Sequence, residues 1–259
     1  MNRKVSPASP AQAPHEPLTD YYESEQHRQA YLREIFDNTA PDYDRIEAML
    51  AWGTGPRYRR QALGRAGLAT DMRVLDVAIG TGLVALQACH LTGDPACVTG
   101  IDPSLGMMTA SRLPLGVRLV EGRAESLPFP DNHFDFVSMG YALRHISDLG
   151  VAFAEFERVL KPGGRLCILE ITQAHNRVGQ WLLKAYMRSV IPLLARWVTT
   201  QKNTPTIWRY YWDSIEACVP PEQVLATLQA SGFMQVKRHL EIGIFSEYQA
   251  RKSSSPILS

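Results

Sequence analysis

A glycine turn between an apolar strand and a helix constrains the fold of this chain more than any other feature. Residues 74–82 read Val-Leu-Asp-Val-Ala-Ile-Gly-Thr-Gly, and a helical pattern of apolar residues starts at Leu83. Gly80 and Gly82 have no Cβ, so the backbone can turn tightly there and come close to a ligand. The unpaired N–H groups at the start of the helix point into the same crevice. This stretch therefore predicts a binding site at the end of a strand.

An acidic side chain follows the turn at the spacing of a nucleoside-binding fold. Asp102 lies 20 residues after Gly82, at the end of the apolar run 98–102. A carboxylate in that place can accept hydrogen bonds from ribose hydroxyls, so the two features together predict a nucleoside-bearing cofactor. Residues 80–85 also fit the dinucleotide fingerprint. The stretch alone leaves NAD and S-adenosylmethionine open.

The composition is that of a soluble globular protein and narrows the class of partner. Of the 259 residues 45% are hydrophobic, and Lys+Arg 27 against Asp+Glu 26 leave a net charge of +1. This balance gives no broad cationic surface, so we expect no nucleic acid partner. The four cysteines form no C-x-x-C pair and no zinc spacing, which favours a reducing compartment and no metal site. Without an apolar run of about 20 residues, we expect a cytoplasmic protein.

Strand and helix patterns alternate along the chain, which predicts an α/β fold with a doubly wound, mostly parallel Rossmann-like sheet of seven strands. Two N-terminal helices are expected to precede it. The expected strands are 72–77, 97–101, 117–120, 134–139, 165–171, 234–238 and 242–249. The expected helices are 22–37, 45–66, 83–91, 105–112, 149–160 and 221–231. Only a short link joins the last two strands, so we expect them to pair as an antiparallel hairpin.

The domain boundaries follow from composition. Residues 19–251 are expected to form a single domain, whereas 1–18 and 252–259 are rich in Pro, Ala or Ser and are predicted to be disordered tails. Residues 173–215 fall outside the alternation. We expect them to form a helical lid inserted over the carboxyl ends of the strands, where ligands bind in such sheets.

Several further motifs form a set with the glycine turn. They are Phe36-Asp37 with Tyr43-Asp44, Asp102-Pro103-Ser104 with Met107-Met108, Ala124-Glu125 with Leu127-Pro128-Phe129, Leu143-Arg144, Leu160-Lys161-Pro162-Gly163-Gly164, Leu169-Glu170, Arg209-Tyr210 and Gly232-Phe233. With them the chain resembles class I S-adenosylmethionine-dependent methyltransferases, and specifically the ubiquinone/menaquinone biosynthesis C-methyltransferase family. The resemblance runs from about Phe36 to Glu247 and implies S-adenosyl-L-methionine as the cofactor.

The resemblance and the glycine turn together place the cofactor site. The residues expected to bind the cofactor are Asp76, Gly80, Thr81, Gly82, Asp102, Pro103, Met108, Arg123, Ala124 and Gly140. The chain departs from the family at two of these places. Leu83 follows the turn where relatives carry an acidic residue, and Arg123 stands where Asp or Asn usually accepts from the adenine amino group. Because arginine cannot accept a hydrogen bond, we expect the Ala124 N–H and the apolar walls of Pro103 and Met108 to hold adenine.

The loop after the expected strand 134–139 is the predicted catalytic segment. An aromatic carbon is a poor nucleophile until a neighbouring hydroxyl loses its proton, so C-methylation calls for a base. We predict that His145 accepts the proton and that Arg144 stabilises the oxyanion. The family has Arg-Asn in place of Arg144-His145, which leaves the substrate open. The alternative is that this segment only starts the next helix, with Asp148 as its N-cap, and for Asp148 we favour that alternative.

The substrate is expected on the side of the lid. The residues expected there are Tyr43, Tyr141, Tyr186, Arg209 and Tyr210. Residues 179–198 carry a wide apolar face with Lys184 and Arg188 one turn apart. That face fits a lid over an apolar substrate, a peripheral membrane contact, or packing on the core or on a second subunit of a homodimer.

The leading functional hypothesis is methyl transfer from S-adenosylmethionine to an apolar aromatic acceptor, with C-methylation of a quinol-like or related secondary metabolite favoured. O- or N-methylation of another small molecule or an isoprenoid, and cofactor binding without catalysis, stay open. An NAD-dependent oxidoreductase would need a Tyr-x-x-x-Lys pair, which the predicted strands do not supply at a sheet edge.

Overall fold

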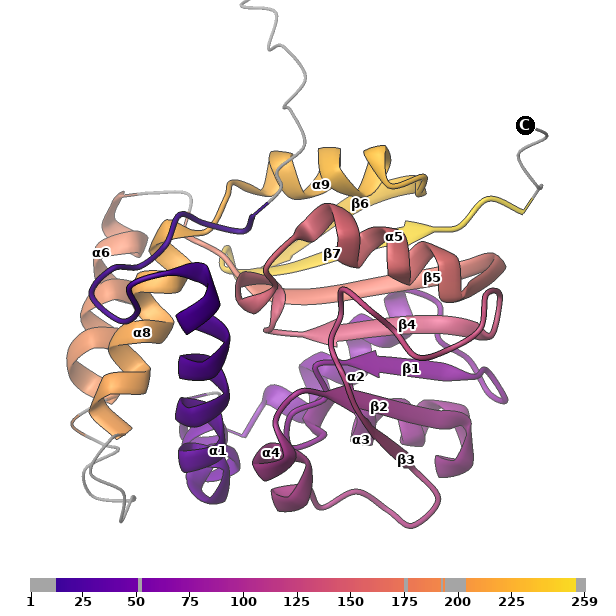
Figure 1. The fold of residues 1–259 in the computed structure, drawn as a ribbon, viewed down its shortest axis with the longest axis horizontal. Helices are drawn as coiled ribbons and strands as arrows, with labels where there is room; N and C mark the ends of the chain where they lie inside the picture. Colours follow the sequence, from indigo (N-terminus) through magenta and orange to yellow (C-terminus); the bar gives the residue numbers. More distant parts are fainter. Residues whose placement is uncertain (1–12, 51–52, 175–176, 192, 194–203, 255–259) are drawn as a thin grey trace, which may run out of the picture.

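A twisted sheet with helices on both faces forms the centre of the molecule (Figure 1). The computed structural model describes residues 13–50, 53–174, 177–191, 193 and 204–254. The sheet has seven strands in the order β3-β2-β1-β4-β5-β7-β6. The strands are β1 (Val74–Val77), β2 (Val98–Asp102), β3 (Arg118–Glu121), β4 (Phe134–Gly140), β5 (Leu160–Ile171), β6 (Met234–Glu241) and β7 (Phe245–Arg251).

The pairing confirms the predicted sheet. β1 pairs in parallel with β2 and with β4, and the parallel pairing continues outward to β3 and β5. β7 runs antiparallel to both β5 and β6, so the predicted C-terminal hairpin closes one side of the sheet. A strand at the centre of such a sheet is covered on both faces, and all four residues of β1 are buried, Asp76 among three apolar neighbours.

Helices cover the sheet and one of its ends. Their bounds are α1 (Glu25–Leu50), α2 (Gly55–Arg65), α3 (Leu83–Thr92), α4 (Leu105–Ala110), α5 (Leu149–Val159), α6 (Arg177–Ala185), α8 (Thr204–Ala217) and α9 (Pro221–Ala230), with helical turns η1 (Pro95–Cys97), η2 (Leu143–His145) and η3 (Tyr186–Val190). Figure 1 shows α1, α6 and α8 side by side at the end of the sheet, away from the helices that cover its faces.

Two apolar cores fix the helices on the sheet. Phe153 and Phe156 of α5 and Leu228 of α9 pack on one face. Leu63 of α2 and Val84 of α3 pack on the other. A third cluster, which includes Ile35, Ile207, Tyr211 and Trp212, joins α1 to α8 at the end of the sheet.

The first helix is longer than predicted. The expected helices, 22–37 and 45–66, leave a gap that contains Pro41, and proline inside a helix removes a hydrogen bond and clashes with the preceding turn. Instead α1 continues through Pro41 to Leu50. The buried face around Ile35 and Ala40 is held by its neighbours and offsets the local cost of the proline. Residues 51–52, inside the second predicted helix, lie outside the described residues.

The Pro162-Gly163-Gly164 segment lies between the expected helix 149–160 and the expected strand 165–171, and its structure differs from the connecting turn that these ranges leave there. α5 ends at Val159, and these three residues belong to β5. The pairing of β4 with β5 shifts register here, since Phe134 is opposite Leu160 while Phe136 is opposite Arg165. Gly163, with φ of 78°, supplies the backbone conformation that this irregularity needs.

The segments next to the chain ends pack on the core where they are described. His15, expected in the N-terminal tail, is 5% exposed, and its Nε2 lies 3.0 Å from the Arg144 carbonyl oxygen. Lys252 donates through Nζ to the Glu157 carbonyl at 2.8 Å. Residues 1–12 and 255–259 of the two predicted tails lie outside the described residues. No helix within the described part of the chain is long and apolar enough to cross a membrane.

Asp148 caps α5, so its loss should reduce stability. Its Oδ1 accepts from the Val151 N–H at 3.0 Å. We expect Asp148→Ala to lower the free energy of unfolding by about 1 kcal/mol, because an N–H at the helix start loses its partner. Denaturant unfolding measures the change, and Asp148→Ser, which retains a capping oxygen, should stay close to wild type. An unchanged stability of the alanine variant would contradict the capping role.

Candidate cofactor and substrate site

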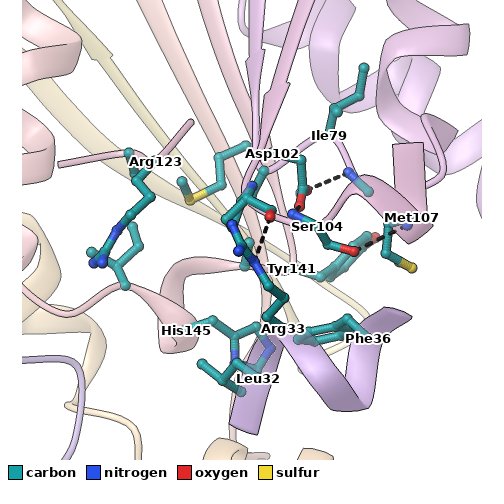
Figure 2. A pocket seen from close by; sticks show the side chains of 18 of the residues that line it. Leu32, Arg33, Phe36, Ile79, Asp102, Ser104, Met107, Arg123, Tyr141 and His145 are labelled. Carbon is teal, nitrogen blue, oxygen red and sulfur yellow. Dashed lines mark hydrogen bonds between the residues drawn. The ribbon is translucent and has the colours of Figure 1, made fainter. Parts of the chain in front are cut away.

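A cavity of about 860 Å³ lies at the carboxyl ends of the central strands (Figure 2). Its floor is formed by the glycine turn after β1 and by the ends of β2 and β4, and α1 forms a wall. The volume is in the range of small-molecule and cofactor sites. This is the position that the doubly wound fold predicts for a ligand.

Asp102 joins the two loops at the floor of the cavity. Its Oδ2 accepts from the Gly80 N–H at 2.8 Å, and its Oδ1 accepts from the Ser104 N–H at 2.8 Å. Burial raises the pKa of the Asp102 carboxyl to about 6, although the two N–H donors act in the opposite direction. Each oxygen has a second lone pair, and the side chain lines the cavity. The carboxylate can therefore accept from a ligand's hydroxyls while it holds the turn in place.

Two aspartates of α1 explain why the Phe36-Asp37 and Tyr43-Asp44 motifs lie where they do. Asp37 Oδ1 accepts from the Gly106 N–H at 3.0 Å and from the Ser104 hydroxyl, at the start of α4. Asp44 accepts from the Thr81 hydroxyl at 2.5 Å, in the glycine turn. These bonds fix α1 against both loops of the floor.

Arg123 lies at the opposite side of the cavity from Met107 (Figure 2). Its guanidinium donates to Gln29 of α1 and, at 3.3 Å, to the Ser147 hydroxyl. It also pairs with Glu125, whose Oε1 accepts from the Ser147 N–H at 2.7 Å. Arg123 thus binds acceptors from α1 and from the loop after η2.

His145 extends from η2 into the cavity, beside Leu32 (Figure 2). Its Nδ1 lies 3.1 Å from the Tyr210 hydroxyl, and its Nε2 has no hydrogen-bond partner among the described residues. Burial, together with the charge of Arg144, lowers the pKa of His145 well below the usual 6.5. The imidazole is therefore neutral at pH 7.

Arg144 does not line the cavity. Its guanidinium is 1% exposed and forms a buried ion pair with Glu170 of β5, while its Nε donates to the Ser214 hydroxyl at 3.0 Å. It lies 4.8 Å from the centre of the Tyr211 ring. Arg144, which precedes the predicted base His145 in the chain, thus anchors η2 to β5 and α8.

Aromatic side chains form the remaining wall. Tyr43 of α1 and Tyr211 of α8 share a hydrogen bond at 2.9 Å between their hydroxyls, and both line the cavity. Tyr141 adopts a φ of 60°, which is rare for a bulky residue, as the chain leaves β4. Its ring lines the same cavity. Strained backbone of this kind is often found at ligand sites.

The structure brings most of the expected site residues together. Those that line the cavity are Tyr43, Asp76, Gly80, Thr81, Asp102, Pro103, Arg123, Ala124, Gly140, Tyr141 and His145. Those that do not are Gly82, Met108, Arg144, Tyr186, Arg209 and Tyr210. Met107, one residue before the predicted Met108, lines the cavity, and Met108 packs in the core with α3.

The residues missed from the sequence come chiefly from helices. Gln29, Leu32 and Phe36 of α1 line the cavity, as does Arg59 of α2. Arg59 stands in the run Arg57-Tyr58-Arg59-Arg60, which looks like an exposed charged face. Nothing in its spacing indicates a buried position. The Phe36-Asp37 and Tyr43-Asp44 motifs were the signals in the sequence that pointed to α1 as part of the site.

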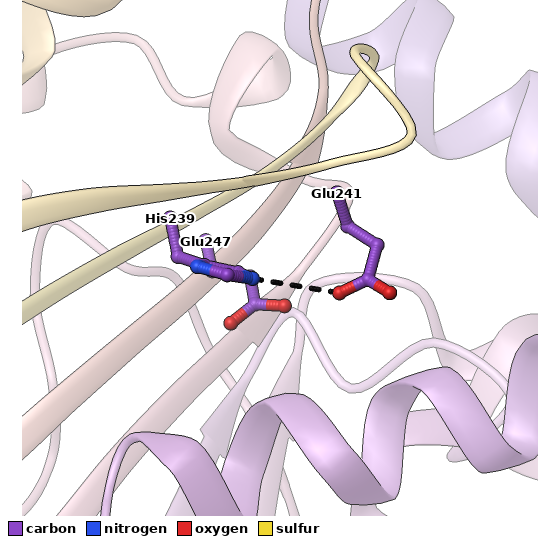
Figure 3. Close-up of side chains that lie close together, drawn as sticks. All are labelled: His239, Glu241 and Glu247. Atoms are coloured by element: carbon purple, nitrogen blue, oxygen red, sulfur yellow. Dashed lines mark ion pairs between the residues drawn. The ribbon is translucent and has the colours of Figure 1, made fainter.

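Three residues that could ligate a metal gather outside the cavity, on the hairpin of β6 and β7 (Figure 3). They are His239, Glu241 and Glu247, and their ligand atoms lie within 4.8 Å of one another. Arg65 donates to Glu247 at 2.5 Å and to Glu241 at 3.0 Å. One guanidinium thus pairs with both carboxylates of this cluster, and the cluster is explained as an ion-pair network.

The residues of the cavity fit S-adenosylmethionine. Asp102 can accept from ribose, and the buried Arg59 and Asp76 leave polar atoms without partners among the described residues. A family profile described as the ubiE/COQ5 methyltransferase family matches residues 24–252.

Curated relatives and a solved structure agree with this match. The chain is 34% identical over 215 residues to the ubiquinone/menaquinone biosynthesis C-methyltransferase UbiE of Pseudomonas savastanoi pv. phaseolicola, covering 80% of this chain and 83% of that protein. It is 35% identical over 227 residues to UbiE of Syntrophotalea carbinolica, covering 85% and 94%. A SAM-dependent methyltransferase from Thermotoga maritima shares the fold with a TM-score of 0.60 at 21% identity, over 85% of this chain and 99% of that one. The chain therefore belongs to the ubiE/COQ5 methyltransferase family and is an S-adenosylmethionine-dependent methyltransferase.

Proposed function

We propose that this enzyme methylates a ring carbon of an apolar, quinol-like aromatic acceptor. The observation that carries the proposal is the neutral His145, which lines the cavity together with Leu32, Phe36 and Tyr211 and whose Nε2 has no hydrogen-bond partner in the described part of the chain. An apolar aromatic ring would find complementary surface there, and its hydroxyl would find an acceptor. The names of the curated relatives support carbon as the methylated atom.

His145 is the proposed proton acceptor. When bound, S-adenosylmethionine supplies a methyl group on a sulfonium, and alignment of donor and acceptor contributes much of the rate. Removal of the hydroxyl proton by Nε2 raises the electron density of the acceptor ring. The ring carbon gains the methyl group as S-adenosylhomocysteine leaves, and the hydrogen that this carbon carried is then lost as a proton, which restores the aromatic ring. A depressed pKa keeps Nε2 unprotonated at neutral pH, although it makes the base weaker. Phe36 and Tyr210, whose ring centres lie 5.2 and 5.6 Å from that of His145, hold the imidazole in place.

Arg144 has a different role in this proposal from the one expected at first. Contact with an oxyanion would require its guanidinium in the cavity, and the pair with Glu170 holds it behind Tyr211. We assign Arg144 to positioning: its anchored backbone fixes the neighbouring His145. Proton transfer is assigned to His145 alone.

We propose that the cofactor lies across the carboxyl ends of the strands, with adenine near β3 and the methyl group towards β4. Asp102, at the end of β2, accepts from ribose, and Ala124, after β3, lies beside adenine with Pro103. Thr81, Gly80 and Gly140 line the space between the ribose and the acceptor. Arg123 closes the adenine end through its bonds to α1 and to Ser147.

Exposed apolar side chains on α6 support a second proposal, which concerns contact with a membrane. Val178, Trp181 and Leu182 are 68%, 66% and 55% exposed. We propose that this face contacts the cytoplasmic side of a membrane that holds the apolar acceptor. Part of the predicted lid, residues 194–203, lies outside the described residues.

Vesicle binding tests the proposed membrane contact. The wild-type protein should co-sediment with phospholipid vesicles, and Trp181→Ser should co-sediment less, because an exposed apolar ring is lost. If light scattering instead shows a dimer that the same substitution disrupts, and vesicle binding is absent, the surface belongs to a homodimer.

Asp102 should control cofactor affinity. Asp102→Ala is expected to weaken S-adenosylhomocysteine binding by about 1–3 kcal/mol, because charge-assisted hydrogen bonds to ribose are lost. In the wild type the affinity should fall as the pH drops through about 6, where the carboxyl takes up a proton and ceases to be an anionic acceptor. Titration calorimetry at several pH values measures both effects. A dissociation constant unchanged by the substitution would contradict the ribose assignment.

Methyl transfer with an isotope-labelled methyl group tests the acceptor and the base together. We expect the protein to place the label on a ring carbon of a hydroquinone with an apolar side chain, as read by NMR and mass spectrometry. His145→Ala should lower turnover by about 100-fold or more and leave S-adenosylhomocysteine affinity unchanged. Between pH 6.5 and 8 the wild-type rate should show no loss from protonation of His145, since its pKa lies below that range.

Two results would contradict parts of this proposal separately. Label on oxygen or nitrogen would replace C-methylation by the corresponding O- or N-methylation. Turnover of His145→Ala within threefold of wild type would remove His145 from the mechanism.

A further inference from the structure

A segment before the first helix packs against the part of the chain that carries His145. Residues 13–23, which we call the N-terminal strap, run past α8 before the chain enters α1 (Figure 1). The strap lies outside residues 24–252, which the family profile matches. Pro14 is buried, and His15 and Tyr22 are 5% and 4% exposed. Segments next to a chain end are usually poorly ordered, so burial here requires contacts that hold the strap in place.

The strap is attached to α8 and to the residues that follow it. The Pro14 carbonyl accepts from the Val219 N–H at 2.7 Å, just after α8. Further along the strap, the Tyr21 hydroxyl donates to Asp213 Oδ2 of α8 at 2.5 Å. Because these bonds join parts of the chain that are far apart in sequence, they fix the strap across α8 in the folded protein.

His15 reaches from the strap to the backbone beside the proposed base. Its Nε2 lies 3.0 Å from the Arg144 carbonyl oxygen, and the bond is buried. A carbonyl oxygen can only accept, so Nε2 carries a hydrogen and donates it. Arg28 of α1 donates to the same oxygen at 2.9 Å. The peptide unit that joins Arg144 to His145 is thus held by two donors, which limits the movement of the backbone that carries the imidazole.

Strap tyrosines also order the residue that meets the imidazole. The ring centre of Tyr21 lies 5.3 Å from that of Tyr210 in an edge-to-face arrangement, and Tyr22 belongs to the same apolar cluster as Tyr210. The Tyr210 hydroxyl lies 3.1 Å from His145 Nδ1. A neutral imidazole has one ring hydrogen, and a hydrogen that Nδ1 donates to Tyr210 leaves the lone pair on Nε2. This is the tautomer that a proton acceptor at Nε2 needs.

We propose that the N-terminal strap positions the base, with His15 and Tyr21 as its positioning residues. His15 fixes the backbone of His145, and Tyr21 orders Tyr210, which accepts from the Nδ1–H and keeps the Nε2 lone pair available. Neither His15 nor Tyr21 lines the cavity, so both act through other residues. The inference rests on the proposed role of His145 as proton acceptor.

Steady-state kinetics of strap variants test the proposal. We expect His15→Ala to lower kcat by about 10-fold or more, because small displacements of a catalytic group reduce the rate steeply. The KM for the acceptor and the S-adenosylhomocysteine affinity should change by less than about twofold, since binding groups are untouched. His15→Gln retains a donor and should recover most of the rate. His27→Ala removes an exposed histidine of α1 and should match wild type.

A double-mutant cycle separates positioning from a general effect on the fold. In the His145→Ala background, adding His15→Ala should lower the residual turnover by less than about twofold, because the group that the strap positions is already absent. A purely structural strap would lower turnover by the same factor in both backgrounds. Thermal unfolding followed by circular dichroism shows that each variant is folded at the assay temperature.

Nitrogen NMR of labelled histidine reads the imidazole of His145 without any methyl acceptor. Wild-type His145 should show the tautomer with its hydrogen on Nδ1. His15→Ala and Tyr210→Phe should each show a mixture of tautomers, because the contacts that select one of them are lost. The His145→Ala variant identifies the signals of His145 by their absence.

Separate outcomes would overturn the strap and the base. Wild-type kcat in His15→Ala, or an equal loss of turnover in the two backgrounds, would remove the positioning role. A hydrogen on Nε2 of wild-type His145 would refute Tyr210 as the acceptor from Nδ1. Turnover of His145→Ala close to wild type would refute the proposed base, and the histidine spectra would then decide alone whether the strap orders the imidazole.

Discussion

The site depends on the hydrogen bonds that the Asp102 carboxylate forms with two loops of the sheet. The carboxylate accepts one N–H from the loop after β1 and one from the loop after β2, each at 2.8 Å. A single side chain therefore sets the distance between the glycine turn and the start of α4. Because backbone N–H groups hold both oxygens, the carboxylate has a fixed direction before any ligand arrives, and the ribose hydroxyls that we propose as its ligand would meet an acceptor that needs little reorganisation.

Helix α1 converts this open strand-end crevice into a cavity. Asp37 and Asp44 attach it to the two floor loops, and Arg28 donates to the carbonyl oxygens of Arg144 and Ile146 at 2.9 and 3.1 Å. The same helix thus contacts the glycine turn, the start of α4 and the loop that carries His145. This explains how a segment outside the strand–helix alternation contributes so much of the wall.

The fold could be predicted because its signals are local. Buried parallel strands are continuous apolar runs, and the glycine turn has a backbone requirement that few other residues meet. The exceptions have tertiary causes. Pro41 continues a helix because packing against α8 outweighs its local effect, and Pro162–Gly164 joins a strand because β4 pairs beside it.

The site was less predictable for the same reason. Asp102 and Thr81 could be placed from motif spacing, since the strand ends bring them together. Arg59 could not, because its burial depends on α1 covering α2 through Glu47. Arg144 stands next to His145 in sequence, yet its partner Glu170 comes from another strand and turns it away from the cavity. Spacing predicts which backbone positions approach the site, and long-range partners decide where each side chain points.

The division of the cavity between sheet and helices has an evolutionary consequence. The groups that we propose for the adenosine side are attached to strand ends, whereas Leu32, Phe36 and Tyr211 belong to α1 and α8. Substitutions on those two helices can reshape the acceptor side while the strand ends stay intact. Descendants of one ancestral chain can therefore diversify in the molecules they modify and still use the same methyl donor.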